Sequence, residues 1–340
     1  MNQQHGTSFA ASSSNTLAEK DRGAGVTSPN QASFAEGTVL VGSPEQMLPG
    51  IKRELACFIG LTFVLTWALA AYGWFHNGLK SGVLPLAMLL PMSVALFVQR
   101  FVAHRPAFRG GELGIRWGRS RYWVLAPAVI LLFWSVAFLL DIALHPDLLA
   151  SKLEIAAAVR GLRNVPAPAM SVGGKLALAY LMTVFVAPLL NLPIFLGEEI
   201  GWRGFMTPRL VALYGRPGLL VAGAVWAAWH LPFIAMGLNY PTHPVLGLGA
   251  WLVFCIEFGI VLQTIVVRSG SVFPAALAHG VTNQVTMLTL SIFFVERRFN
   301  DLIDMPAGLI VVALLAVPAV YAYRTFPVHR GSASVARRVE

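Results

Sequence analysis

The sequence contains few charged residues and almost no cysteine. Charged residues make up only 12% of its 340 residues, against about 25% in soluble domains, and this argues against a water-soluble globule. The two cysteines, Cys57 and Cys255, lie within long apolar runs, where they are typical of small buried hydrophobes rather than of a disulfide framework. Apolar residues make up 56% of the chain. The composition therefore favours a membrane protein.

Two common hydrolase motifs are also missing. The chain contains no Gly-x-Ser-x-Gly sequence, which marks the nucleophile of many serine hydrolases, and no His-Glu-x-x-His sequence, which marks a zincin helix. Neither a serine triad nor a zincin site is therefore supported.

The chain divides into three parts by composition. Residues 1–50 are rich in Ser, Asn, Gln, Gly and Ala without hydrophobic periodicity, so we expect a disordered cytoplasmic tail. This segment has neither the basic start nor the apolar core of a cleaved signal peptide. We expect residues 51–325 to form a transmembrane domain and residues 326–340 to form a second cytoplasmic tail.

Apolar runs of about 20 residues, the length that crosses a bilayer as a helix, predict the fold. We expect an all-α, polytopic membrane helical bundle of about eight transmembrane helices around a polar intramembrane cavity, because the fourth and seventh runs carry polar residues near membrane depth. The predicted spans are 54–75, 82–102, 122–144, 175–196, 217–236, 246–267, 272–295 and 305–323.

The distribution of Lys and Arg predicts the orientation. One set of alternate connections, which includes both tails, holds 18 of these residues, and the other set holds 7. Cytoplasmic connections retain the excess of positive charge, so we expect both termini in the cytoplasm and the chain in the cell membrane. The arginines between Arg100 and Arg121 would face anionic membrane lipids. The net charge of +9 therefore does not call for a nucleic-acid partner.

Two adjacent carboxylates, Glu198 and Glu199, follow the fourth apolar run. Neighbours on a helix point about 100° apart, so the two cannot share a face, whereas Glu199 and Arg203 at i and i+4 can pair. This leaves Glu198 to face a cavity as a candidate general base. The alternative is that the carboxylates only mark the cytoplasmic end of a helix, where charged residues are common.

Two histidines lie within later predicted spans. Trp226 and His230 share one face of the fifth span, and His279 and Asn283 share one face of the seventh. A carboxylate and a histidine can deprotonate a water, while a second histidine and an amide can donate hydrogen bonds to an oxyanion. These are the minimum parts of a hydrolase whose nucleophile is water.

These residues resemble the motifs of the CPBP family of intramembrane peptidases, also called the Abi family, which is related to the CAAX prenyl endopeptidase known as the Ras-converting enzyme. Its Glu-Glu-x-x-x-Arg element matches Glu198, Glu199 and Arg203. Its Phe-x-x-x-His element matches Trp226 and His230 with tryptophan in place of phenylalanine, and its His-x-x-x-Asn element matches His279 and Asn283. Gly197, Gly201, Trp202 and Gly204 also match, and the resemblance covers about residues 175–290.

The resemblance implies an eight-span core and an intramembrane endopeptidase. Glu198 and His230 would activate water, His279 and Asn283 would stabilise the oxyanion, and Glu199 and Arg203 would support the site. The family is often described as a metalloprotease, and Glu198, His230 and His279 could supply a zinc site. A metal-free mechanism explains Asn283 better, so we favour it. The substrate would be a peptide or a lipidated protein.

Two other classes of function compete with this one. A catalytically silent scaffold or immunity protein of the same family would be expected to lack one of the motif residues, and here all six are present. A transporter would be expected to repeat the Glu-Glu-x-x-x-Arg context in a second half, and no second copy occurs. Both observations favour the peptidase.

Overall fold

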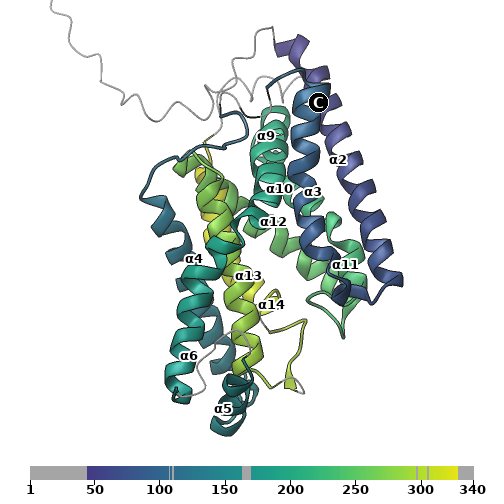
Figure 1. Cartoon of the computed structure of the whole chain (residues 1–340). Coiled ribbons are helices and arrows are strands. Elements are labelled where there is room, and N and C mark those ends of the chain that lie inside the picture. Colours follow the sequence, from purple (N-terminus) through teal and green to yellow (C-terminus); the bar gives the residue numbers. More distant parts are fainter. Residues whose placement is uncertain are drawn as a thin grey trace, which may run out of the picture. The chain divides into compact units, whose positions relative to one another are not determined.

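The computed structural model describes residues 44–106, 108, 111–162, 170–295, 298–304 and 306–327. These residues form helices and no β-strands, which confirms an all-α bundle (Figure 1). The longer helices are α2 (Pro44–Phe75), α3 (Val83–Phe97), α4 (Tyr122–Leu144), α6 (Val172–Leu181), α10 (Pro217–Trp229), α12 (Pro244–Ser269), α13 (Phe273–Phe293) and α14 (Leu309–Thr325).

The predicted tails fall mostly outside this part of the chain. Residues 1–43 and 328–340 lie outside the described residues. Helix α2 begins at Pro44, so it extends into the segment predicted as the N-terminal tail, and the predicted disorder of that tail stays a prediction. Residues 44–50 continue the first apolar helix by about two turns.

Five helical segments are long and apolar enough to cross a membrane: 48–75, 83–102, 122–144, 172–190 and 244–269. They correspond to the first, second, third, fourth and sixth predicted spans. Helices α10 and α14, at the fifth and eighth, are shorter apolar helices. Helix α13, at the seventh, has 21 residues, several of them polar. The bundle is therefore as predicted, whereas eight crossings stay a prediction.

The bounds of the fourth and fifth predicted spans are wrong. In the fifth, α10 ends at Trp229, before the predicted end at residue 236. In the fourth, the helix that begins with α6 continues through the π-helical turn η4 (Met182–Val186) and α7 (Ala187–Leu190), and ends at Asn191. A second helical rod follows at once, made of α8 (Leu192–Glu199), the π-helix η5 (Ile200–Met206) and α9 (Thr207–Tyr214). Glu198 and Glu199 therefore lie in the middle of a rod, not at the end of a span.

The arginine-rich connections between helices lie together at one end of the bundle. Arg209 on α9 and Arg105 after α3 both bind the Glu54 carboxylate of α2, and the distance from Arg209 Nε to Glu54 Oε2 is 2.9 Å. Arg116, before α4, donates to the carbonyl of Gly270, between α12 and α13, at 2.7 Å. The connections assigned to one compartment by the Lys and Arg count thus contact one another.

Two histidine–aspartate pairs connect the loops at the opposite end of the bundle. Asp301, between α13 and α14, accepts hydrogen bonds at 2.7 Å from the backbone N–H and from the hydroxyl of Thr242, and it also contacts His243. His145 Nδ1, after α4, lies 3.1 Å from Asp304 Oδ1. Both aspartates are buried. The α13–α14 connection is thereby fixed to two others.

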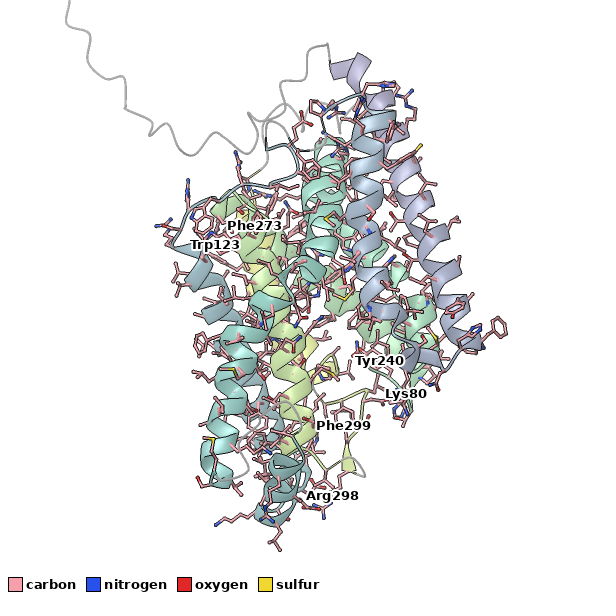
Figure 2. All side chains as sticks on the ribbon, viewed as in Figure 1. Lys80, Trp123, Tyr240, Phe273, Arg298 and Phe299 are labelled. Atoms are coloured by element: carbon pink, nitrogen blue, oxygen red, sulfur yellow. The ribbon has the colours of Figure 1, made fainter. Side chains whose placement is uncertain are left out.

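The two ends can be followed in Figure 2. The rings of Trp123 and Phe273 stack with their centroids 5.5 Å apart at one end, whereas Lys80, Tyr240 and Arg298 lie toward the other. The polar residues of the fourth and seventh predicted spans lie between these ends, on α8, η5 and α13.

Glycines set the position of the α8–η5 rod. A Cβ at Gly197 would lie 2.5 Å from the Met88 carbonyl oxygen of α3, and a Cβ at Gly201 would meet Pro91. A Cβ at Gly204 would meet the backbone of Leu113, which precedes α4. Only glycine lets the backbones approach this closely. The rod that carries both carboxylates therefore lies in backbone contact with α3.

Candidate functional site

The two adjacent carboxylates are almost completely enclosed. Glu198 is 2% exposed and Glu199 is 0% exposed. They end α8 at the point where the helix widens into the π-helix η5, and π-helical turns occur frequently at functional sites. Charged groups that only marked an interfacial helix end would lie in water, so this burial contradicts that alternative.

Glu199 is the centre of an ion-pair network. Its Oε1 atom lies 3.2 Å from Arg203 Nη1, the contact predicted from their i, i+4 spacing, and 2.9 Å from His279 Nδ1 on α13. Since a carboxylate can only accept, Nδ1 of His279 must carry the hydrogen. Glu199 therefore links η5 to α13 and fixes the ring of His279.

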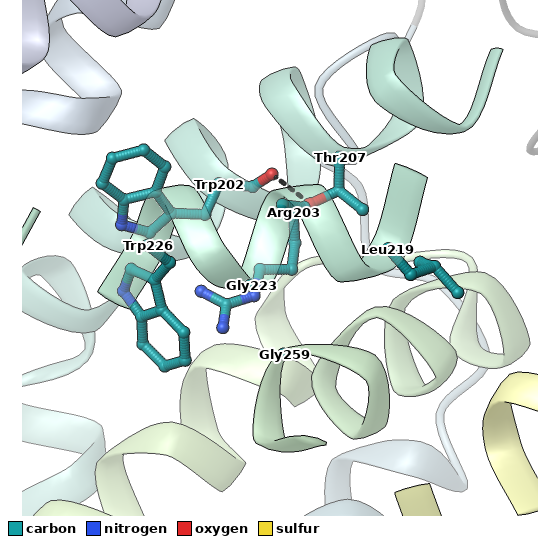
Figure 3. Close-up of a pocket in the computed structure, with 8 residues that line it drawn as sticks. Trp202, Arg203, Thr207, Leu219, Gly223, Trp226 and Gly259 are labelled. Carbon is teal, nitrogen blue, oxygen red and sulfur yellow. Dashed lines mark hydrogen bonds between the residues drawn. The ribbon is translucent and has the colours of Figure 1, made fainter. Parts of the chain in front are cut away.

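Arg203 lies against a small cavity. Its guanidinium stacks 3.8 Å from the ring centroid of Trp226 and points toward Gly223 and Gly259 (Figure 3). The cavity has a volume of about 10 Å³, which is close to the minimum that holds one water. Neither terminal nitrogen of Arg203 makes a hydrogen bond with the described side chains or backbone.

Glu198 has a different partner from its neighbour. The indole Nε1–H of Trp226 on α10 donates to Glu198 Oε2 at 2.8 Å, and both side chains are buried. The second carboxylate oxygen has no hydrogen bond within the described part of the chain. The two adjacent carboxylates thus contact different helices, as the 100° rule predicts.

His230 lies where α10 ends. Its Nδ1 atom is 2.8 Å from the carbonyl oxygen of Trp226, one turn earlier, so Nδ1 carries the hydrogen and the neutral ring presents Nε2 as an acceptor. Trp229 and Trp251 pack edge-on against the ring, at centroid distances of 4.6 and 4.9 Å. No hydrogen bond joins His230 directly to Glu198 among the described side chains, and the two are linked through Trp226.

His279 and Asn283 lie one turn apart on α13. The His279 ring packs between Phe195, Trp226 and Phe258, at centroid distances of 5.5, 5.8 and 6.1 Å. Asn283 is half-buried, and its side chain makes no hydrogen bond with the residues that the structure describes. Its amide is therefore available to a ligand, as an oxyanion donor would need to be.

Residues 173–285 match the family model described as Type II CAAX prenyl endopeptidase Rce1-like. The match covers one third of the chain and includes both carboxylates, Arg203, both histidines and Asn283. No curated protein matches the chain.

The family-model match assigns residues 173–285 to the CAAX protease (CPBP) family. At the level of that family the chain is a CAAX-type intramembrane protease, and together with the five long apolar helices this makes it an integral, multi-pass membrane protein. The matched segment runs from α6 to α13, so it includes the rod that carries the carboxylates.

The positions of the donor atoms indicate whether this CAAX protease site could bind a metal ion. Both histidines donate through Nδ1, to a backbone carbonyl and to a carboxylate, as metal-binding histidines generally do. The three predicted zinc ligands, however, are not gathered within ligating distance. Within the described residues, one group of three ligand-type side chains has its donor atoms within 4.8 Å of one another, and it lies at the Asp301 end of the bundle: Asp141, His145 and Asp304.

Two features of the CAAX protease site were missed from the sequence. The π-helix η5 has no simple sequence signal. The indole N–H of Trp226 was also missed, because the substitution for phenylalanine was interpreted only as one aromatic ring for another. The signal was present, since a buried tryptophan N–H needs an acceptor.

The predicted polar cavity is not seen around the carboxylates. A larger hollow of about 550 Å³ lies between α4, α6 and α13, and its walls are mainly apolar, with Tyr180 and Thr289 among the polar residues. Neither Glu198 nor His230 lines it. In the described part of this protease the site is closed, and a polar cavity around it stays a prediction.

Proposed function

We propose that this CAAX protease is an intramembrane endopeptidase in which Glu198 is the general base and water is the nucleophile. The observation that carries the proposal is the different bonding of two adjacent buried carboxylates. Glu199 is ion-paired with Arg203 and His279, whereas Glu198 accepts one hydrogen bond from a neutral indole and has no ion pair in the described part of the chain. Within the same residues, each carboxylate keeps one oxygen without a hydrogen bond, but only that of Glu198 belongs to a group that is not held by charged partners.

The reaction would proceed in two steps. Glu198 accepts a proton from a water oriented by Nε2 of His230, the water oxygen forms a bond to the peptide carbonyl carbon, and the carbonyl π electrons move to oxygen. The oxyanion then collapses, the C–N bond breaks, and the leaving nitrogen takes the proton from Glu198. The products are a carboxylic acid and an amine.

The oxyanion would be stabilised from α13. The Asn283 amide can donate directly. His279 can donate from Nε2 only when its ring is doubly protonated, since Nδ1–H is already bonded to Glu199. Glu199 and Arg203 would hold this side of the site in place.

The substrate, the membrane and the orientation belong to the same proposal. The family description names a prenyl endopeptidase, so we propose a prenylated CAAX peptide or a related peptide as substrate. We further propose that the chain lies in the cell membrane with both termini in the cytoplasm, where the arginine-rich end contacts anionic lipids.

The test is peptide cleavage by the purified full-length protein in lipid nanodiscs, followed by mass spectrometry of the products. Prenylated and plain CAAX peptides are compared for the wild type, Glu198→Gln and His230→Ala. Losing a general base lowers the rate by about 10²–10⁴-fold. The matched control is Glu257→Gln, which removes a half-buried glutamate of α12 outside the site.

The expected result is cleavage that is lost in both site variants and kept in the control. Cleavage that survives Glu198→Gln would overturn the assignment of the base. A wild type that cleaves neither peptide would favour a catalytically silent member of the family.

A further inference from the structure

Trp226 contacts four of the other candidate site residues. Its indole Nε1–H donates to Glu198 Oε2 at 2.8 Å, and its backbone carbonyl accepts from His230 Nδ1 at 2.8 Å. The face of its ring lies 3.8 Å from the Arg203 guanidinium, and the His279 ring meets it edge-on at a centroid distance of 5.8 Å. The contacts of the ring would survive replacement by phenylalanine, whereas the bond to Glu198 would not.

The indole N–H matters because the carboxylate has little else to hold it. Glu198 is 2% exposed, so bulk water cannot replace a lost donor. Cys255, Glu199, Arg203 and His279 interact with it electrostatically, but none of the four donates a hydrogen bond to it in the described structure. The N–H of Trp226 therefore determines which carboxylate oxygen is engaged and which is free.

We propose that Trp226 is a positioning residue that holds Glu198 through Oε2 and leaves Oε1 to take the proton from water. This role rests on the proposed function, since it assumes that Glu198 is the base. It is specific to tryptophan at this position, because phenylalanine, the residue in the motif that this segment resembles, has no N–H to donate.

The bond also affects the pH range of the reaction. A hydrogen bond donated to a carboxylate favours its charged form, which is the form that can act as a base. The bond lost in Trp226→Phe is donated to a charged group, the stronger kind of hydrogen bond. We expect Trp226→Phe to move the acidic limb of the kcat/KM profile to higher pH by about one unit or more.

The experiment measures kcat/KM against pH for the wild type, Trp226→Phe and a matched control, Trp134→Phe. Trp134 on α4 also donates a buried indole N–H, to Thr282 Oγ1 at 3.1 Å, so the control removes the same kind of bond away from Glu198. The expected result is a shifted acidic limb in Trp226→Phe and an unshifted limb in Trp134→Phe. Equal limbs in the wild type and Trp226→Phe would overturn the inference.

A second measurement separates this inference from the proposed function. The resonance Raman band that reports indole hydrogen bonding is isolated for Trp226 as the difference between the wild type and Trp226→Phe. It should show a bonded N–H that is lost in Glu198→Ala, whether or not the protein cleaves peptides. A free N–H in the wild type would overturn the inference even in an active enzyme. A bonded N–H in a wild type that cleaves nothing would overturn the proposed function and the positioning role together.

Discussion

Replacing Glu199 by glutamine should destabilise the protein far more than replacing Glu198, although the two residues are neighbours. Glu199 is 0% exposed and contacts Arg203 at 3.2 Å and His279 at 2.9 Å. Glutamine has no charge to balance the Arg203 guanidinium, which is itself 2% exposed. Removing one partner of a buried ion pair costs about 3–5 kcal/mol, because the other charge stays buried without compensation.

The same change at Glu198 should be mild. The amide oxygen of glutamine can still accept the indole N–H of Trp226, so the only hydrogen bond of that side chain survives. The expected cost is about 1 kcal/mol or less. For a chain of this size, 3–5 kcal/mol corresponds to a lowering of the melting temperature on the order of 5–10 °C.

The assay is thermal unfolding in detergent, followed by tryptophan fluorescence, for Glu199→Gln, Arg203→Met, Glu198→Gln and the double variant that combines Glu199→Gln with Arg203→Met. The double variant removes both charges, so its loss of stability should be smaller than the sum of the two single losses by about 2 kcal/mol. The reasoning is refuted if Glu199→Gln melts within about 1 °C of the wild type, or if the losses are additive.

Three further predictions concern packing, pH and metal. Gly223→Ala should lower the free energy of unfolding by about 2 kcal/mol or more, because the new methyl group would meet the backbone of α12. Gly259→Ala should be almost neutral, since the nearest neighbours of its methyl group would lie 3.8 and 3.9 Å away. Equal melting temperatures for the two variants would contradict this prediction. Burial raises the pKa of the Asp301 carboxyl, but hydrogen bonds from His243 and Thr242 lower it more, so it lies below its ordinary value of 3.8. Its contribution to stability is therefore complete above about pH 4 and is lost as the pH falls through the lowered pKa, and Asp301→Asn should flatten stability against pH in that range. Chelation should leave peptide cleavage intact, because the predicted zinc ligands are not gathered; activity that disappears with EDTA and returns with zinc would contradict the metal-free mechanism.

The sequence predicted much of the fold because hydropathy and length report directly on membrane helices. The third span was predicted at 122–144 and is found at Tyr122–Leu144. The fourth failed because a count of apolar residues contains no information on where a helix breaks. One helical rod ends at Asn191 and the next begins there. The prediction assumed spans of about 20 residues and therefore placed no break at this position.

Among the contacts between the candidate site residues, the sequence predicted one. Spacing alone predicted the contact between Glu199 and Arg203, because i, i+4 pairs meet on any helix. The hydrogen bonds of Glu199 to His279 and of Glu198 to Trp226 join residues 80 and 28 positions apart. Such contacts depend on how helices pack, which no local pattern specifies. The roles proposed for these residues stay predictions.

The unequal packing around α8 determines how a closed site of this kind can admit a peptide. On the α3 side, Gly197 lies against the backbone of Met88, so separating these helices would break backbone-to-backbone contact along the rod. On the α13 side, the corresponding close approach is between Gly280 and the ring of Phe195, a side chain that can rotate about its own bonds. We therefore expect α3 and α8 to move as one rigid body when substrate enters, and the ring of Phe195 to be the part of the α8–α13 contact that can adjust.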